Sequence, residues 1–387
     1  MIGSGPAPPL AEKGQILARK GQGRARSPRS SGGAWWKPAG GKSLDNRRLP
    51  PYTPGMICVP VTAATTAGAV ADLREAAAAA DLVELRLDYV RDLDLRALFR
   101  ARPAAPATGR PVPLVATCRA GWEGGRFEGT EGARLSILRE AAALGADYVD
   151  VETKVDPLPD LGRAKVILSR HDFEGTPADL AGLYRAIAAR APHVVKIAAT
   201  PRNGAELAAL ARLAARADGP RVVLGMGGLG LATRLLYRRL GCLWTYASLR
   251  PGAESASGQV PARILRDVYR ADRCGPRTRV FAIGGPGGGD SIPDLFNRAF
   301  AALGLDAICL PLPLRGGGDL PAVVAALGIE GTFEPGPAEG GEALLRRAAA
   351  QWKAWTGSDL PGAALADWRR MASAGRGGAD PPAGVRG

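Results

Sequence analysis

Lys196 and His171 are the residues of this sequence best suited to covalent and proton-transfer chemistry. Lys196 lies in the apolar run VVKIAAT, where a buried amine can lose its proton and condense with a ketone or aldehyde, as a guanidinium cannot. His171, one of two histidines, lies 25 positions upstream in SRHDF and can exchange protons near neutral pH. A lone lysine at a strand end is more often structural, but this pair predicts Schiff-base chemistry. From Met56 onward arginine is abundant and the lysines are few: Lys154, Lys165, Lys196 and Lys353.

Short apolar runs alternate with Ala/Leu/Arg-rich stretches between residues 56 and 272. Continuous apolar runs are typical of parallel strands covered on both faces, and the alternation predicts βαβ units. Eight such units favour an α/β fold of the (β/α)8 TIM barrel type over an open sheet. We expect strands at 57–61, 82–88, 114–119, 148–153, 165–173, 194–200, 221–227 and 243–248, and helices near 66–80, 92–101, 131–144, 177–190, 203–217, 229–240 and 259–270.

Ionisable residues gather at the predicted carboxyl ends of these strands, where barrel enzymes carry their active sites. Glu84, Arg86 and Asp88 alternate with leucines, so their side chains are predicted to lie on the same face of the strand. For Asp88 and Glu152 we expect buried ion pairs without chemistry. His193 lies at the opposite end of a strand and is expected to be structural. The residues gathered at this edge are Glu84, Arg86, Arg119, Glu123, His171, Lys196 and Arg234.

The composition is that of a globular protein, with 387 residues, 46% hydrophobic and 23% charged. No apolar run approaches the ~18–20 residues that a membrane span needs. Five scattered cysteines without a C-x-x-C pair argue against a zinc site or a disulfide framework. We therefore expect a cytoplasmic protein with no metal and no membrane association.

Residues 1–55 supply much of the net charge of +14, with ten basic and two acidic residues. The stretch is rich in Gly, Pro and Ser and lacks periodicity, which predicts a disordered basic extension. A mis-assigned translation start is our first interpretation, since the regular pattern begins at Met56. A nucleic-acid-binding arm or a transit-like segment is an alternative, but the barrel itself gives no reason to expect nucleic acid as a partner.

A second, small α/β module is predicted over residues 278–357, followed by a disordered tail at 373–387. We expect strands at 279–285 and 307–314 and helices at 291–304, 319–328 and about 342–355. The Gly-rich turn GGPGGGD (284–290) suggests a phosphate loop, but it matches neither common nucleotide fingerprint and is better read as a tight turn.

Six segments in register give residues 56–270 a resemblance to type I 3-dehydroquinate dehydratase, the barrel enzyme of the shikimate pathway. The final segment has Ser257 where the family usually has Pro, which leaves every functional group in place. The matching segments are VELRLD (83–88), TCRAGWEGG (117–125), SRHDFEGTP (169–177), VKIAATP (195–201), MGGLGLATR (226–234) and SASGQVP (255–261).

The resemblance implies a dehydration of 3-dehydroquinate through a Schiff base on Lys196, with His171 as general acid/base and Glu123 orienting the imidazole. It implies no metal or organic cofactor and a homodimer. Because a protonated amine is unreactive, we expect burial and nearby cations such as Arg119 to lower the pKa of the lysine. The implied substrate contacts are Glu84, Arg86, Arg119, Arg234, Ser255 and Gln259.

The C-terminal module more faintly resembles the substrate-binding half of shikimate dehydrogenase. Asp290 and Ile292 stand where that family has two substrate-binding serines, and Ser291 is displaced by one position. No lysine lies where its catalytic lysine belongs, Lys353 falls within a helix, and no nicotinamide-binding domain is recognisable. We therefore expect a degenerate module without dehydrogenase activity.

Two other functions remain open from the sequence. The barrel could be another Schiff-base lyase or a class I aldolase, although Arg234 and the SASGQ segment disfavour this. Alternatively, the barrel could be a scaffold whose C-terminal module senses a metabolite or binds a partner.

Overall fold

Eight parallel strands form one sheet in the computed structural model, which describes residues 55–285, 291–314, 318–335 and 341–374. The strand order is β7-β6-β5-β4-β3-β2-β1-β8, and every pairing is parallel. The strands are β1 (Met56–Val61), β2 (Leu82–Arg86), β3 (Leu114–Thr117), β4 (Tyr148–Glu152), β5 (Lys165–Asp172), β6 (Val194–Ala199), β7 (Arg221–Gly225) and β8 (Trp244–Tyr246). The predicted α/β barrel is confirmed. Of the predicted extension at 1–55 only Gly55 is described, and of the predicted disordered tail at 373–387 only Ser373 and Ala374, which belong to a helix and not to a disordered segment.

The seam between β7 and β8 is the one place where neighbouring strands of this sheet lack ladder pairing. At its amino end the seam is held by one backbone hydrogen bond, from Leu243 N to Arg221 O at 2.9 Å. The barrel is therefore nearly closed. At the carboxyl end of the seam, a side chain is needed to join the two strands.

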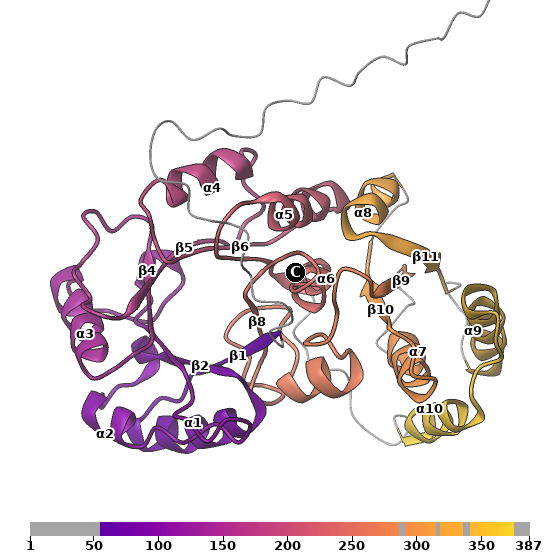
Figure 1. The fold of residues 1–387 in the computed structure, drawn as a ribbon, viewed down its shortest axis with the longest axis horizontal. Coiled ribbons are helices and arrows are strands. Elements are labelled where there is room, and N and C mark those ends of the chain that lie inside the picture. Colours follow the sequence, from indigo (N-terminus) through magenta and orange to yellow (C-terminus); the bar gives the residue numbers. More distant parts are fainter. Residues whose placement is uncertain (1–54, 286–290, 315–317, 336–340, 375–387) are drawn as a thin grey trace, which may run out of the picture. The chain divides into compact units, whose positions relative to one another are not determined.

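Helices follow most strands and cover the outside of the sheet (Figure 1). A Thr, Asp or Asn side chain caps five of them by accepting a backbone N–H of the first turn, which fixes where each helix begins. The helices are α1 (Thr66–Ala79), α2 (Leu95–Arg100), α3 (Glu131–Ala143), α4 (Leu180–Ala188), α5 (Gly204–Arg216) and α6 (Gly227–Leu235).

The helix predicted at 259–270 is wrong in extent. Only a short π-helical turn, Ile264–Val268, occurs there. The preceding residues pair with Ser248 instead, which donates its N–H to Val260 O and accepts the N–H of Ala262. This pairing keeps the segment extended up to Pro261, so little chain is left for a helix.

A three-stranded parallel sheet of order β10-β9-β11 forms the C-terminal module. The sequence predicted neither β11 nor α10. In β11 the side chain of Trp355 fills the space where a Cβ of Gly331 would stand, at 2.4 Å from its Nε1, so a tertiary contact explains a glycine that reads as a strand breaker. The elements are β9 (Arg279–Gly284), α7 (Ser291–Ala302), β10 (Ala307–Leu312), α8 (Leu320–Leu327), β11 (Ile329–Phe333), α9 (Gly341–Thr356) and α10 (Gly362–Ala374).

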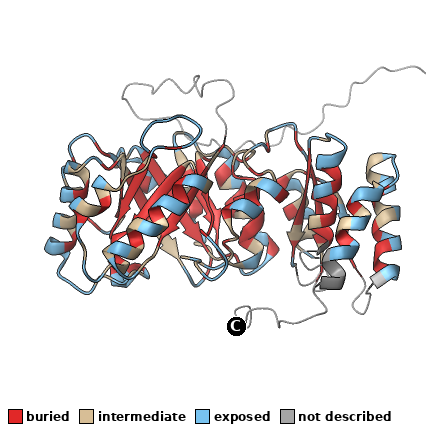
Figure 2. Cartoon of the chain, turned by 90° about the horizontal axis from the view of Figure 1, so that it is seen from below, coloured by how far each residue is buried: buried red, intermediate tan, exposed pale blue. Residues whose placement is uncertain are grey.

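The module and the barrel share one hydrophobic core. Along β9, Val280 and Ala282 belong to the core that contains the barrel helices, whereas Phe281 and Ile283 pack with α7, α9 and α10. This alternation follows from the period of two of a strand. Both faces of the small sheet are thus covered, and the strands are buried in Figure 2 while the helices are exposed on their outer sides.

No helix among the described residues is long and apolar enough to cross a membrane.

Replacing Ile308 should destabilise the barrel together with the module, because Ile308 is fully buried in the shared core. We expect Ile308→Ala to cost about 2–5 kcal/mol and to lower a single thermal transition measured by calorimetry. The matched control is Ile264→Ala, since Ile264 is 40% exposed and its loss should cost less than about 0.5 kcal/mol. A separate early transition for the module, with the barrel transition unchanged, would contradict a shared core.

Candidate active site

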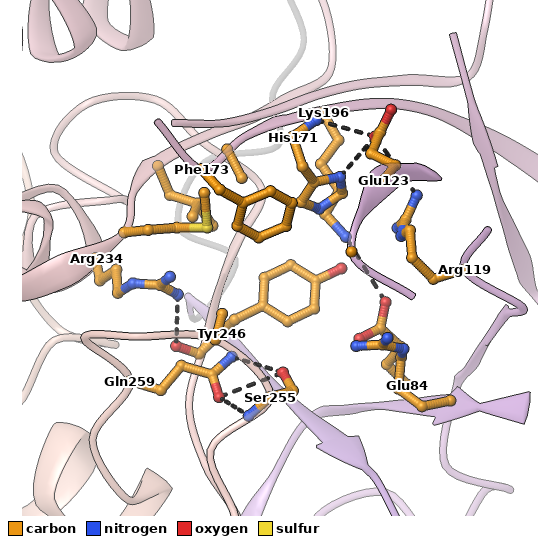
Figure 3. Close-up of a pocket in the computed structure, with 16 residues that line it drawn as sticks. Glu84, Arg119, Glu123, His171, Phe173, Lys196, Arg234, Tyr246, Ser255 and Gln259 are labelled. Atoms are coloured by element: carbon orange, nitrogen blue, oxygen red, sulfur yellow. Dashed lines mark hydrogen bonds and ion pairs between the residues drawn. The ribbon is translucent and has the colours of Figure 1, made fainter. Parts of the chain in front are cut away.

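A pocket lined by charged, polar and apolar side chains opens at the carboxyl ends of the barrel strands. All nine site residues predicted from the sequence line it (Figure 3). Their positions agree with the prediction that the strand ends converge there. The pocket residues that the sequence analysis did not single out are Gly124, Phe173, Ala198, Leu224, Met226, Tyr246 and Ala256.

Lys196 projects from β6 into this pocket and is only 4% exposed. Its Nζ lies 2.8 Å from Asp150 Oδ2 and 3.6 Å from Glu84 Oε1. The expectation of a cationic neighbourhood is therefore wrong for the nearest groups, because Arg119 contacts Asp150 rather than the amine. The charged groups nearest to the amine are therefore two carboxylates.

His171, on β5, is oriented by Glu123, which follows β3. Glu123 Oε1 lies 2.9 Å from His171 Nδ1 and accepts the backbone N–H of the same residue at 3.0 Å. This contact leaves Nε2 as the ring nitrogen available to a ligand. Burial, followed by the charges of Arg119 and Lys196, lowers the pKa of His171 well below its ordinary value. The imidazole is thus neutral near pH 7 and able to accept a proton.

Burial also raises the pKa of Glu123, to about 7, against the opposing effect of Arg119. Arg119 lies at 3.9 Å from Glu123 Oε1, while Glu152 adds a second negative charge that favours the protonated form. A carboxyl group that titrates near neutrality can respond to small changes in the charge of its neighbours.

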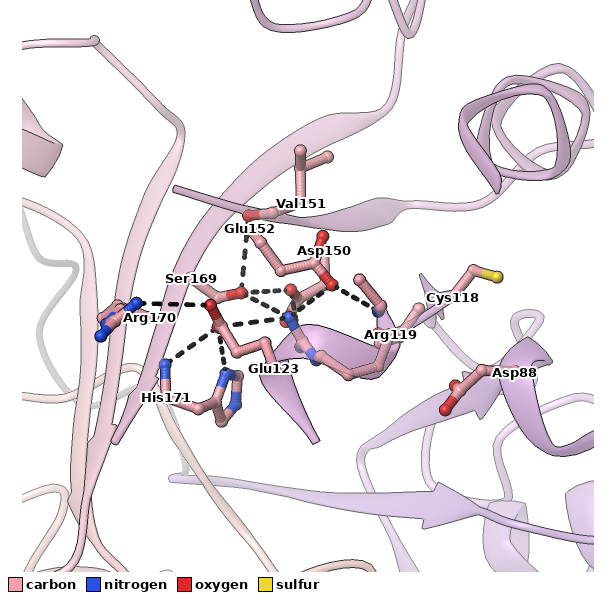
Figure 4. A network of polar contacts seen from close by, with 12 residues as sticks. Asp88, Cys118, Arg119, Glu123, Asp150, Val151, Glu152, Ser169, Arg170 and His171 are labelled. Atoms are coloured by element: carbon pink, nitrogen blue, oxygen red, sulfur yellow. Dashed lines mark hydrogen bonds and ion pairs between the residues drawn. The ribbon is translucent and has the colours of Figure 1, made fainter. Parts of the chain in front are cut away.

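Arg119 lies at the centre of a buried ion-pair network (Figure 4). It contacts Asp150 Oδ1 at 2.8 Å, Glu152 Oε1 at 3.0 Å and Ser169 Oγ at 2.8 Å. Burial opposes its charge, but Asp150 and Glu152 outweigh that effect and raise the pKa of Arg119. Burial alone would raise the pKa of Asp150, yet Arg119 and Lys196 lower it. Arg119 and Asp150 therefore stay ionised.

Asp150 is the group of this network that the sequence analysis missed. It alternates with Glu152 along β4, so the period of two that was applied to the Glu84 strand would have placed both acids inside the barrel. Glu152 does form buried ion pairs, with Arg119 and with Arg134 Nη1 at 2.7 Å.

Asp88 differs from its predicted position, because β2 ends at Arg86 and Asp88 lies in a 3-10 turn. It still forms the expected ion pair, accepting hydrogen bonds from Arg86 Nε at 2.9 Å and Nη2 at 2.8 Å. Glu84 remains on the strand and accepts a hydrogen bond from Thr117 Oγ1 at 2.8 Å. His193 lies away from this pocket, where its Nδ1 accepts the N–H of Val166.

Arg234, on α6, spans the carboxyl end of the β7–β8 seam. Its Nε donates to Gly225 O at 2.9 Å and its Nη1 to Tyr246 O at 3.3 Å. It is 1% exposed, no carboxylate among the described residues pairs with it, and burial lowers its pKa to about 10. Gly225 and Gly230 pack backbone to backbone beside it, since a Cβ on either would lie within 2.4 Å of the other. The guanidinium is thus a fixed cation that lacks an anion.

Ser255 and Gln259 cover the same side of the pocket from the loop after β8. Gln259 Oε1 accepts the Ser255 N–H at 2.9 Å, and Gln259 Nε2 donates to Ser255 Oγ at 3.0 Å. The loop binds the start of α6 through Gly227 N, which donates to Ser257 O at 3.0 Å. Gly258 has φ +78° and lies so close to Gly227 O that a side chain there would clash.

The family model described as Type I 3-dehydroquinase matches residues 57–275. The chain belongs to this family. The match covers the barrel and its pocket, and it agrees with the resemblance carried by the six sequence segments.

Known relatives include the chloroplastic bifunctional 3-dehydroquinate dehydratase/shikimate dehydrogenase of Arabidopsis thaliana, 35% identical over 274 residues, which are 67% of this chain and 44% of the relative. The chain thus spans less than half the length of that protein. The 3-dehydroquinate dehydratase of Methanococcus vannielii is 30% identical over 55% of this chain and 98% of its own length. The solved structure of 3-dehydroquinate dehydratase from Geobacillus kaustophilus is 24% identical to this chain and has a TM-score of 0.49. The match covers 56% of this chain and 90% of the solved chain.

The difference in unfolding free energy between the Glu123→Gln variant and the wild type should depend on pH. The folded-state pKa of Glu123, about 7, exceeds the ordinary value near 4.3, so the wild type loses stability as pH rises through this window. We expect the difference in unfolding free energy to move in favour of the variant between pH 5 and 7, by up to about 3 kcal/mol, and to level off above. Thermal melts at pH 5, 6, 7 and 8 measure it. Glu174→Gln, an exposed glutamate near His171, is the matched control, and a flat difference for Glu123→Gln contradicts the raised pKa.

Proposed function

We propose that this protein dehydrates 3-dehydroquinate to 3-dehydroshikimate through a Schiff base on Lys196. The observation that carries the proposal is one pocket holding a buried amine, an oriented neutral imidazole and an arginine without a counter-ion. Family membership supports the substrate, because the matched relatives are named 3-dehydroquinate dehydratases.

The ketone of the substrate would react with Nζ of Lys196. The ammonium gives up one proton, and the free amine adds to the carbonyl carbon to form a carbinolamine. The same proton then goes to the hydroxyl of the carbinolamine, which leaves as water, so a protonated imine remains. This imine draws electrons from the neighbouring C–H bond and makes its proton acidic. Asp150 and Glu84, at 2.8 and 3.6 Å, are the carboxylates that hold the amine in position before attack.

His171 would accept the proton from that carbon, since its imidazole is neutral and held by Glu123. The electron pair left behind forms an enamine, which expels the hydroxyl group of the next carbon. His171 returns its proton to that hydroxyl, which leaves as water. Hydrolysis of the imine then releases the enone and restores the amine, so the net change is loss of one water.

Arg234 would bind the ring carboxylate of the substrate. Its guanidinium can form two parallel hydrogen bonds to a carboxylate, and it is buried without an acidic partner among the described residues. Ser255 and Gln259 lie in the loop beside it and would contact the hydroxyl groups of the ring.

Reductive trapping tests this mechanism at Lys196. Incubation with 3-dehydroquinate and borohydride should give a covalent adduct that peptide mass spectrometry places on Lys196, and Lys196→Ala should lose both the adduct and enone formation. Lys353→Ala is the matched control, because that side chain is 62% exposed and its loss should change neither result. A wild type that gives neither adduct nor enone sinks the proposal.

We also propose that the C-terminal module has no shikimate dehydrogenase activity. Asn297 joins α7 to β10, because its side chain donates to the carbonyl of Cys309 and accepts the N–H of the same residue. Lys353, by contrast, lies in α9 and pairs with Asp359 at 2.9 Å on the surface. The one lysine of the module is thus engaged in a surface ion pair, which supports the absence of a catalytic lysine there.

A spectrophotometric assay checks this second proposal. Shikimate with NADP should give no reduced cofactor above background, and the Arabidopsis relative, whose name includes this activity, is the positive control. Reduction of NADP at a rate proportional to protein concentration would show that the module is active.

A further inference from the structure

Tyr246 lies against the amine of Lys196, and the sequence analysis did not single it out. Its ring centroid is 4.5 Å from Lys196 Nζ, and the side chain is only 4% exposed. Figure 3 shows the ring in the middle of the pocket, between Arg234 on one side and Lys196 and Glu84 on the other. The aromatic face therefore meets the atom that would form the imine.

The position of this ring is fixed by the barrel itself. Tyr246 pairs with Cys58 across β8 and β1, and its carbonyl accepts a hydrogen bond from Arg234. The side chain packs in the apolar interior cluster with Leu224 and Trp244. The ring is thus held before any ligand arrives, and little reorganisation is needed when charge develops beside it.

The ring remains a neutral aromatic surface. Burial raises the pKa of the Tyr246 phenol well above its ordinary value, so the hydroxyl keeps its proton and the ring carries no charge. An uncharged ring with a negative face attracts a cation at this distance, by up to about 2 kcal/mol in a desolvated site.

The chemistry at Nζ makes such a surface useful. As an ammonium, the nitrogen has three N–H donors and is held by Asp150 at 2.8 Å and Glu84 at 3.6 Å. A protonated imine keeps the positive charge but has a single N–H, so it can no longer satisfy both carboxylates. Attraction to an aromatic face requires no N–H, and therefore it favours the iminium over the uncharged amine and carbinolamine from which the iminium forms.

We propose that Tyr246 is a further catalytic residue, whose ring face stabilises the positive charge on the Lys196 nitrogen in the imine intermediate. This inference rests on the proposed Schiff-base function. The ring face, and not the hydroxyl, is the active part.

Four variants separate the ring from the hydroxyl and from simple packing. Tyr246→Phe keeps the ring and should retain kcat within about threefold, whereas Tyr246→Leu and Tyr246→Met fill the space without an aromatic face. These two should lower kcat by about 10- to 30-fold, the equivalent of the cation–π attraction, and should lower the fraction trapped by borohydride at saturating 3-dehydroquinate. Tyr148→Leu is the matched control, because Tyr148 places its ring 5.4 Å from Lys165, outside the pocket.

The outcomes distinguish this inference from the proposed function. No adduct and no enone in the wild type would overturn both. Normal kcat and trapping in folded Tyr246→Leu or Tyr246→Met would overturn the role of the ring and leave the Schiff-base mechanism standing. An equal loss in Tyr246→Phe would assign the effect to the hydroxyl and overturn the inference as well. Melting temperatures identify any variant that fails to fold, and if Tyr246→Leu fails, the comparison of Tyr246→Met with Tyr246→Phe decides.

Discussion

The carboxylate of Asp150 is the group on which the organisation of the pocket depends. One of its oxygens binds Arg119 and Ser169, and the other binds Lys196. These partners come from the end of β3, from β5 and from β6, so a single buried anion on β4 ties together a run of neighbouring strands. A charge buried without a partner costs several kcal/mol, and each member of this group is stable only because the others are present. The amine of Lys196 is placed by the same contacts that keep these buried charges paired.

Much of the barrel could be predicted because its strands are covered on both faces and read as apolar runs. Seven of the nine predicted site residues could be predicted because parallel strands bring their carboxyl ends to one edge. Ser255 and Gln259, which lie in the loop after β8, were indicated only by the family resemblance. The roles of all nine residues, in contrast, come from the resemblance and remain proposals. The position of Asp88 was predicted less well, since the strand ends two residues earlier and turns.

The missed features depend on contacts between distant parts of the chain. The importance of Asp150 depends on its contacts with Arg119 and Lys196. That of Tyr246 depends on its contact with the Lys196 amine. A local sequence pattern does not reveal these contacts. The glycine within strand β11, Gly331, is explained by Trp355, whose side chain occupies the space that a Cβ would need. The short π-helical turn after β8 arises because Ser248 pairs with the chain that would otherwise have begun a helix. Tertiary contacts override local preference at each of these positions.

At the seam between β7 and β8, a buried guanidinium joins the two strands and also lines the pocket. Arg234 joins the two last carbonyls of these strands, Gly225 O and Tyr246 O, while its charge lacks an anion among the described residues. A carboxylate that binds Arg234 would remove the unfavourable free energy of this lone charge and hold the guanidinium against both strands. By thermodynamic linkage, a ligand that binds only the folded state stabilises it in proportion to its affinity and concentration. An anion bound at Arg234 would thus also stabilise the wall of the barrel that the β7–β8 seam forms.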